Sequence, residues 1–308
     1  ERNPLYWNDK ETVINSATFL AIENPSTDVA RYRAGDLDMT SYGLPPEQFA
    51  KLKKELLGEV YVTRTLGTYS YELNNKKAPF DNVNIRKALN LSLDRNVITD
   101  KVLGQGQTPT YVFTPTYIEE GHLIQQPAYS KEPMAQRNEE AIKLLEEAGY
   151  SKANPLKFSI LYNTNENHKK VAIAAASMWK ANTKGLIDVK LENQEWKTYI
   201  DSRRAGRYDV ARAGWHADYN QATTFGNYFL SNSSNNTAKY ANPEYDKAMA
   251  ESYAATDAEG RAKAYAKAEE ILGKDYGIVP IFNYVNPRLV KPYVKGYSGK
   301  DPQDHIYL

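Results

Sequence analysis

One long alternating stretch is the clearest pattern of apolar and polar residues before position 74, and the other patterns there are short. Residues 60–73 alternate over an unusual length, with Gly67 near the middle. A strand of that length can cross between two lobes, and a glycine inside it can take up a bend. The shorter patterns predict a strand over 11–22, a helix over 28–33, a buried strand over 36–40 and a helix over 45–57.

The second half of the chain alternates regularly between strand and helix patterns. Helices are predicted over 85–93, 95–102 and 137–148, the last closed by Gly149, with a loop over 107–135. Strands over 156–162 and 187–192 then alternate with helices over 169–180 and 196–206, and helices follow over 247–255 and 258–272, the second capped by Asp257. Such alternation is typical of an open α/β sheet that binds its ligand at the carboxyl ends of the strands.

A second apolar strand over 279–285 is suited to be the return crossing. Crossings near residues 67 and 284 predict two lobes, with residues 1–66 and 285–308 in one and residues 67–284 in the other. We therefore expect an α/β protein of two lobes, joined by two crossing strands, with a ligand cleft between them.

The segment Ala211–Asn220 concentrates candidate binding chemistry. It follows the end of a short strand at 208–210 and precedes a helix that opens at 221–225, so we expect a loop. It carries Gly214, the ring of Trp215, the cation Arg212 and the carboxylate Asp218. A carboxylate can meet a cationic amine, and an extended backbone can pair with strand-like main chain. The competing interpretation is that Asp218 only caps the next helix.

Composition narrows the function classes. The chain has 308 residues, 41% hydrophobic and 25% charged, with net charge +1 and no block of like charges, which argues against a nucleic-acid partner or a polybasic membrane anchor. There is no cysteine, and the four histidines have no metal-ligand spacing. Gly-x-Ser-x-Gly does not occur, and no pair of carboxylates stands out as a glycosidase pair. We expect no metal, no cofactor and no catalytic residue.

Several long stretches, in the same order along essentially the whole chain, resemble the oligopeptide-binding members of the type II extracytoplasmic solute-binding proteins (the peptide/nickel family), which serve ABC importers. They are Asn3–Trp7, Arg31–Asp38, Pro79–Leu89, Tyr162–Thr164, Asn193–Lys197, Tyr208–Trp215, Ser231–Asn236 and Tyr284–Pro292. The resemblance implies a periplasmic or otherwise exported monomer that binds short peptides in an interlobe cleft, delivers them to a membrane permease and catalyses nothing.

The resemblance also assigns roles to residues. It implies that Asp218 pairs with the peptide α-amine, and that the main chain around Arg212, Gly214 and His216 pairs with the peptide backbone. Trp196 and Trp215 are implied to line side-chain pockets, and His168 and Arg212 to meet the peptide C-terminus. Three further residues are implied to line the cleft: Tyr284, Asn163 and Glu72. For the tryptophans, core packing is the competing interpretation, and for His168 a simple surface position.

The sequence departs from the family pattern in two ways. A disulfide of enteric members is implied to align with Gly67 and His216, so both cysteines are replaced here. Residues 1–7 are implied to lie well inside the first lobe, so we expect an N-terminal segment of the same protein as a further partner. Two alternatives stay open: a receptor of the same fold specialised for a murein peptide, haem or an antimicrobial peptide, and a peptide hydrolase.

Overall fold

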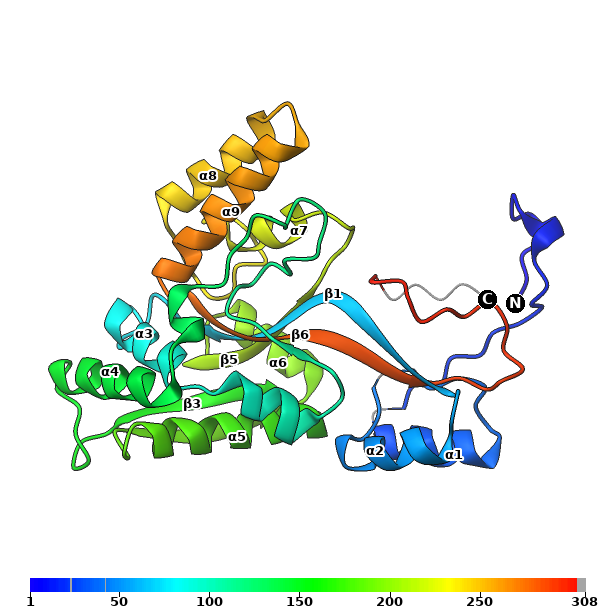
Figure 1. Cartoon of the computed structure of the whole chain (residues 1–308), viewed down its shortest axis with the longest axis horizontal. Coiled ribbons are helices and arrows are strands. Elements are labelled where there is room, and N and C mark those ends of the chain that lie inside the picture. The colour runs from blue at the N-terminus through cyan, green and yellow to red at the C-terminus, as the bar shows by residue number, and fades with distance from the viewer. Residues whose placement is uncertain (23, 42, 304–308) are drawn as a thin grey trace.

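Two long paired strands join a large α/β body to a small helical body (Figure 1). The computed structural model describes residues 1–22, 24–41 and 43–303. The strands are β1 (Val60–Leu73) and β6 (Ile278–Leu289), and they run antiparallel. Their register shifts between Arg64 and Thr68, so Gly67 lies in an irregular part of the pairing. The strand predicted over 60–73 is confirmed, whereas the lobe limits at 66/67 and 284/285 stay a prediction.

The sheet of the large body is mixed, with the order β2-β6-β1-β5-β3-β4. Its other strands are β2 (Thr108–Pro109), β3 (Leu156–Asn163), β4 (Ile187–Gln194) and β5 (Val210–His216). β3 runs parallel to β4 and to β5, whereas β1 is antiparallel to both β5 and β6. The predicted α/β alternation therefore holds for β3, β4 and β5, and the two long strands add an antiparallel part to the same sheet.

Helices cover the sheet and extend beyond it. They are α3 (Val83–Leu91), the π-helical turn η2 (Val97–Leu103), α4 (Met134–Glu147), α5 (Glu166–Asn182), α6 (Trp196–Arg204), α7 (Thr223–Gly226), α8 (Pro243–Ala254) and α9 (Ala258–Lys274), with 3₁₀ turns η1 (Asp9–Glu11), η3 (Ala128–Lys131) and η4 (Asn227–Phe229). Asp257 caps α9 as predicted, since its side chain accepts from the Gly260 N–H. Gly149, with φ of 89°, ends α4 in the left-handed conformation that the sequence predicts.

The main core lies between the sheet and α3, α4 and α5. Trp179 on α5 is fully buried there, and its indole N–H donates to the Leu89 carbonyl of α3 at 2.9 Å. A second apolar cluster joins α7, α8 and α9 to Leu66 and Phe113. Figure 1 shows α8 and α9 as a hairpin on the opposite side of the sheet from α4 and α5. The two clusters hold β1 and β5 from both faces.

The small body has an apolar core of its own. Its helices are α1 (Pro25–Ala34) and α2 (Pro46–Glu55), and Tyr32 and Leu52 pack there against Leu289 at the end of β6. Asn24 caps α1 by accepting from the Ser26 N–H at 2.8 Å.

Three predicted elements differ from the structure. Residues 12–22 form no strand, and Val13 and Phe19 are 81% and 87% exposed. A β-branched run becomes a strand only beside a partner strand, and no strand among the described residues pairs with this one. Residues 36–40 make a single bridge, Met39 to Val290, in place of a strand. Most of the helix expected over 95–102 is the π-helical turn η2, and Arg95 just before it is buried and donates to main-chain carbonyls.

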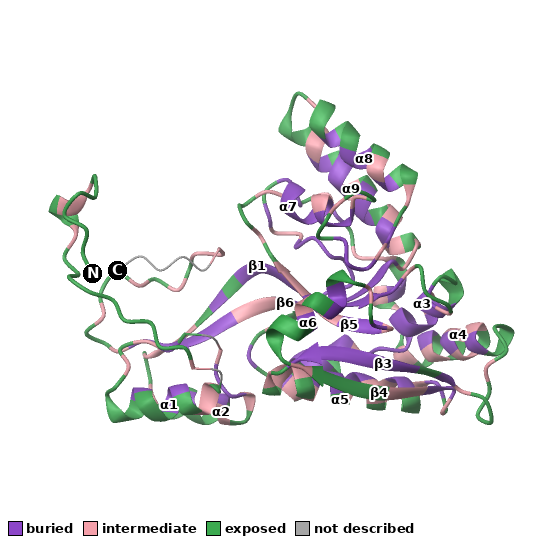
Figure 2. Ribbon diagram, turned by 180° about the vertical axis from the view of Figure 1, so that it is seen from behind, coloured by how far each residue is buried: buried purple, intermediate pink, exposed green. Residues whose placement is uncertain are grey.

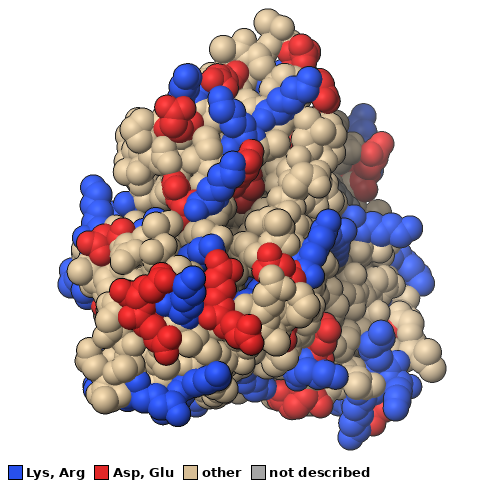
Figure 3. Space-filling model, turned by 60° about the vertical axis from the view of Figure 1, so that its left-hand side comes forward, with Lys and Arg blue, Asp and Glu red and all other residues tan. Residues whose placement is uncertain are grey.

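Burial follows the sheet order. Figure 2 shows β3 buried and the edge strand β4 largely exposed, while the segment before α1 is exposed almost throughout. Acidic and basic side chains are interspersed over the face drawn in Figure 3, in keeping with the net charge of +1.

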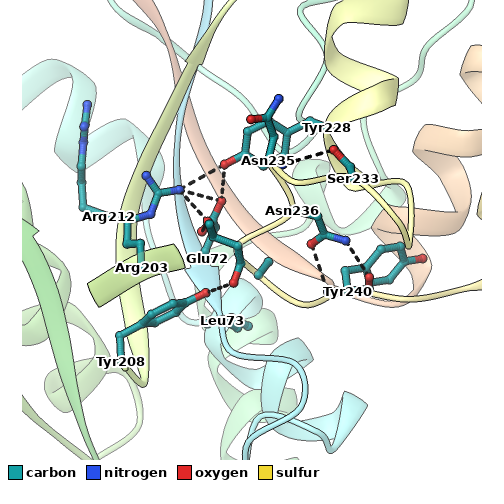
Figure 4. Close-up of polar contacts among 12 residues, drawn as sticks. Glu72, Leu73, Arg203, Tyr208, Arg212, Tyr228, Ser233, Asn235, Asn236 and Tyr240 are labelled. Atoms are coloured by element: carbon teal, nitrogen blue, oxygen red, sulfur yellow. Dashed lines mark hydrogen bonds and ion pairs between the residues drawn. The ribbon is translucent and has the colours of Figure 1, made fainter. Parts of the chain in front are cut away.

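One buried ion pair ties β1 to segments before and after β5 (Figure 4). Glu72 of β1 is fully buried, and its carboxylate lies 2.9 Å from the Arg203 guanidinium of α6. The Tyr228 hydroxyl donates to Oε1 at 2.6 Å and the Thr237 hydroxyl to Oε2 at 2.5 Å. Both oxygens of the Glu72 carboxylate therefore have hydrogen-bond donors, as a buried carboxylate requires.

Replacing one partner of this pair will destabilise the fold strongly. Glu72→Gln leaves the Arg203 charge buried without its counter-ion, a change that costs roughly 3 kcal/mol or more. Urea unfolding measures the loss. The matched control is Glu251→Gln, which removes an exposed pair with Lys267 (3.0 Å) between α8 and α9 and costs about 0–1 kcal/mol. Equal losses in the two variants would contradict this account.

Candidate functional site

Strand β5 has one paired edge and one partly open edge. β1 pairs with all seven of its residues, from Val210 to His216. β3 pairs with β5 only at Val210 and Ala211, and no other described strand lies beside β5 on that side. The stretch expected as a loop from residue 211 is therefore a strand as far as His216, because β1 supplies a partner that local sequence does not reveal.

The alternation of main-chain groups shows which residues face the open edge. Ala217 N–H donates to the Leu66 carbonyl of β1 at 2.8 Å. In an antiparallel pair every second residue directs its N–H and C=O at the neighbour, so Trp215 also faces β1, whereas Arg212 and Gly214 face away. In agreement, the Arg212 carbonyl accepts from the Tyr199 hydroxyl of α6. The main chain of Gly214 thus points to the side that β3 leaves uncovered.

Position 214 has no room for a side chain. A Cβ built there would lie 2.5 Å from the Tyr284 hydroxyl oxygen and 3.1 Å from Arg212 Nη2. The same hydroxyl accepts from Arg212 Nη2 at 2.7 Å. Glycine at 214 is therefore a condition for the Arg212–Tyr284 bond.

Arg212 is a cation held by aromatic rings. Its guanidinium lies over the Tyr69 ring at 5.1 Å and makes a long contact of 3.5 Å to the side-chain oxygen of Asn163, at the end of β3. Among the described residues no carboxylate lies within salt-bridge distance of it. Burial raises the pKa of Tyr69 and of Tyr284, so both hydroxyls stay protonated at neutral pH. The charge of Arg212 is thus not neutralised by any of the described residues.

His168 completes this cluster from the start of α5. Asn165 caps the helix by accepting from the N–H groups of Asn167 and His168, and the His168 ring lies 5.6 Å from that of Tyr69. Burial and the charge of Arg212 hold the pKa of His168 well below its usual 6.5. That His168 is a positive group stays a prediction; its lowered pKa favours the neutral imidazole, and Arg212 is the cation of this cluster.

His216 ends β5 on the exposed side. It stacks on Tyr284 at 4.6 Å and is the cross-strand partner of Gly67. A Cβ on Gly67 would lie 2.6 Å from the His216 ring, so the glycine makes space for the imidazole. The two positions expected to align with the enteric cysteines are therefore direct neighbours here.

Trp215 and Asp218 share one contact, the hydroxyl of Thr224 on α7. Trp215 Nε1 lies 3.2 Å and Asp218 Oδ2 3.1 Å from this oxygen. The N-cap of α7 is Ala222, and the helix has no side-chain cap, so the interpretation of Asp218 as a cap is wrong for this structure. Asp218 is exposed, while Trp215 is half-buried and packs edge-on against Tyr228 at 5.0 Å.

The two remaining predicted residues lie at different depths. Trp196 is 54% exposed at the start of α6 and stacks on Tyr199 at 5.8 Å, which connects it to the Arg212 carbonyl. Glu72 was expected to line the cleft, but its fully buried carboxylate is occupied by Arg203 (Figure 4). Its role in this structure is to hold the sheet to α6.

The structure thus brings together Arg212, Gly214, His216, Tyr284, Asn163 and His168, with Trp215 and Asp218 beyond the end of β5. Sequence reasoning missed Tyr69, Tyr199 and Thr224. The alternation in residues 60–73 gave a signal for Tyr69, since it lies two residues from Gly67 on the same face. No local pattern marks Tyr199 or Thr224.

Comparison with known proteins agrees with this geometry. The family described as bacterial extracellular solute-binding proteins, family 5 middle, matches residues 1–237. The chain belongs to this family. The resemblance read from the sequence is confirmed, and so is the α/β fold of the type II periplasmic binding proteins. No helix in the described part of this family 5 chain is long and apolar enough to cross a membrane, and no group of metal-ligating side chains occurs there.

Relatives within the family 5 proteins are similar over the whole chain. The periplasmic oligopeptide-binding protein OppA of Haemophilus influenzae is 99% identical over 308 residues, which are 100% of this chain and 57% of that protein. The structure of the Escherichia coli murein tripeptide-binding protein MppA matches with a TM-score of 0.91 and 43% identity, covering 97% of this chain and 58% of that one. The structure of Burkholderia pseudomallei OppA matches with a TM-score of 0.90 and 38% identity, covering 97% of this chain and 58% of that one. The chain thus spans a little over half the length of these relatives.

The effects of substitutions at Gly214 and Tyr284 on the free energy of unfolding will be coupled. Gly214→Ala displaces the Tyr284 hydroxyl and breaks its bond to Arg212, which costs about 1–3 kcal/mol. Made on a Tyr284→Phe background, the same change costs less, because the clashing oxygen is already gone. Urea unfolding of the four proteins tests this; an equal cost on both backgrounds would show that Tyr284 does not limit position 214.

His168 will make stability depend on pH. Because its folded-state pKa lies below 6.5, the unfolded state takes up the proton first as pH falls. The neutral His168 therefore makes its full contribution to the free energy of unfolding above about pH 6.5. This contribution is lost as the pH falls from there through the folded-state pKa. Urea unfolding from pH 7.5 to pH 4.5 should show a smaller decline in His168→Gln than in the unaltered protein. Identical declines would place the His168 pKa near its ordinary value.

Proposed function

We propose that this chain forms part of a periplasmic receptor that binds short peptides by their main chain and termini and delivers them to the membrane permease of an ABC importer. The observation that carries this proposal is the open edge of β5 at Gly214, bounded by a cation at Arg212 and a carboxylate at Asp218. A zwitterionic extended ligand has matching groups in the same order: a main chain between two opposite charges.

Main-chain pairing explains how one site can accept many sequences. A peptide laid along β5 pairs with the N–H and C=O that Gly214 directs away from β1, as an added strand does. Every peptide carries these groups, whereas side chains differ. Trp196 and Trp215 offer exposed or half-buried aromatic faces on which side chains of varied shape can rest.

The termini supply the electrostatic part. Asp218 is suited to the α-amine, because its carboxylate is exposed and has no cationic partner among the described residues. Arg212 suits a carboxylate, since the rings around it leave its charge uncompensated. A ligand carboxylate beside His168 would raise its pKa, because a nearby negative charge favours the protonated imidazole. His168 would then add a second positive charge beside Arg212.

Two further proposals concern the assembly. The receptor acts as a monomer towards its permease and binds without catalysis. The side chains of Leu5, Trp7, Val13 and Phe19 are each more than 80% exposed. Exposed apolar segments of this kind mark contact surfaces, and a further segment of the same protein is the partner we propose for them.

A receptor specialised for one peptide is the second candidate, because the structure of the murein tripeptide-binding protein MppA is also similar to this one. Native mass spectrometry of freshly purified protein separates the two cases. A spread of masses from short peptides supports the proposed function, and a single mass supports a dedicated receptor.

Loss of the amine or of its anchor will weaken binding. Asp218→Asn removes one side of an ion pair that the bound peptide covers, which weakens tri- to pentapeptides by roughly 3 kcal/mol or more. N-acetylated peptides should bind the unaltered protein poorly for the same reason. Isothermal titration calorimetry measures both. Asp201→Asn, at an exposed carboxylate on α6, is the control and should keep full affinity. Unchanged affinity after acetylation would exclude Asp218 as the anchor.

A further inference from the structure

A single buried hydroxyl connects the two residues beyond the end of β5. Thr224 is 4% exposed, and its oxygen lies 3.2 Å from Trp215 Nε1, 3.3 Å from the Asp218 main-chain nitrogen and 3.1 Å from Asp218 Oδ2. Trp215 and Asp218 do not need to touch each other for their positions to be linked. Both residues hydrogen-bond to the same atom, the Thr224 hydroxyl oxygen.

The direction of these three bonds follows from the groups involved. An indole N–H and a main-chain N–H can only donate, and a hydroxyl can accept two bonds and donate one. The Thr224 oxygen therefore accepts from Trp215 and from the Asp218 N–H, and its proton points at the Asp218 carboxylate. The hydroxyl is saturated, and a carboxylate that accepts such a bond has one preferred rotamer.

Thr224 itself is fixed by packing. It lies on α7 beside Phe225, which is fully buried in the second apolar cluster, and the Ala222 N–H at the start of the helix donates to the Glu119 carbonyl at 3.1 Å. Asp218, by contrast, is an exposed residue in the irregular segment between β5 and α7. Because the hydroxyl belongs to a packed helix, its hydrogen bond fixes the position of the exposed Asp218 side chain.

We propose that Thr224 is a positioning residue that holds the Asp218 carboxylate and the Trp215 ring in one arrangement and so favours ligands with a free N-terminal amine. This inference rests on the proposed function, in which Asp218 meets the α-amine. It adds a specificity determinant that never contacts the ligand: the hydroxyl orients the anion that does.

The test compares Thr224→Val with Thr224→Ser in the intact protein. Valine has the shape of threonine without the hydroxyl, whereas serine keeps it. Calorimetry with the tripeptide Lys-Ala-Lys should show about tenfold weaker binding for the valine variant, the loss expected for a bond to a charged group. N-acetyl-Lys-Ala-Lys should change by less than about twofold, because it has no amine to meet Asp218. The serine variant should bind both peptides like the unaltered protein.

Thr223→Val is the matched control. Thr223 is its buried neighbour on α7, and its hydroxyl contacts Tyr219 and Gln221 in place of Asp218. This variant should leave both affinities unchanged. Should Thr224→Val fail to fold, Thr224→Ala takes its place, since it removes the hydroxyl without adding a methyl group against Trp215. Equal losses for the two peptides, or a serine variant as weak as the valine variant, would overturn the role of Thr224.

A measurement without ligand separates this inference from the proposed function. The Trp215 indole proton, assigned by its absence in Trp215→Phe, should exchange faster with solvent in Thr224→Val and not in Thr224→Ser. Failure of the unaltered protein to bind either peptide would refute the proposed function. An indole proton unchanged in Thr224→Val would refute the contact on which the positioning depends, whatever the ligand.

Discussion

A charge inside the sheet sets the strongest constraint on this structure. Glu72 is fully buried in β1, and a carboxylate in that position is tolerated only with a cation and hydrogen-bond donors around it. Arg203 comes from α6, before β5 in the chain, whereas Tyr228 and Thr237 come after it. Satisfying one carboxylate therefore fastens both flanks of β5 to the neighbouring strand. The candidate site lies on the segment between these fastenings.

Arg212 illustrates the opposite arrangement, a cation that the protein does not neutralise. Tyr69 and Tyr284 solvate it with a ring face and a hydroxyl, which weakens the penalty of desolvation without supplying a negative charge. Burial keeps both phenols protonated, so they cannot become counter-ions at neutral pH. The many tyrosines of this chain are thus partly explained at this site: they offer a polar yet uncharged environment.

The sequence predicts those parts that depend on local pattern. Strand β1 and the caps at Gly149 and Asp257 follow from alternation and from residue chemistry at helix ends. Residues 11–22 carry a strand pattern and the segment from residue 211 a loop pattern, yet residues 211–216 are the ones in a strand, because β1 lies beside them. Pairing across more than a hundred residues cannot be read from either segment alone. The resemblance to known receptors brought most site residues together, but it did not reveal that Glu72 is occupied by Arg203, nor that Thr224 is shared.

The alternation of main-chain groups along β5 has a consequence for how such a site can be altered. Because its residues face β1 and the open edge in turn, the groups offered outward are decided by whether the count from the Leu66–Ala217 bond is odd or even. Inserting or removing one residue between that bond and Gly214 would turn the other set outward, and with it every side chain to the opposite face. Insertions of two keep the parity, so length changes near this bond are tolerable in pairs and disruptive singly.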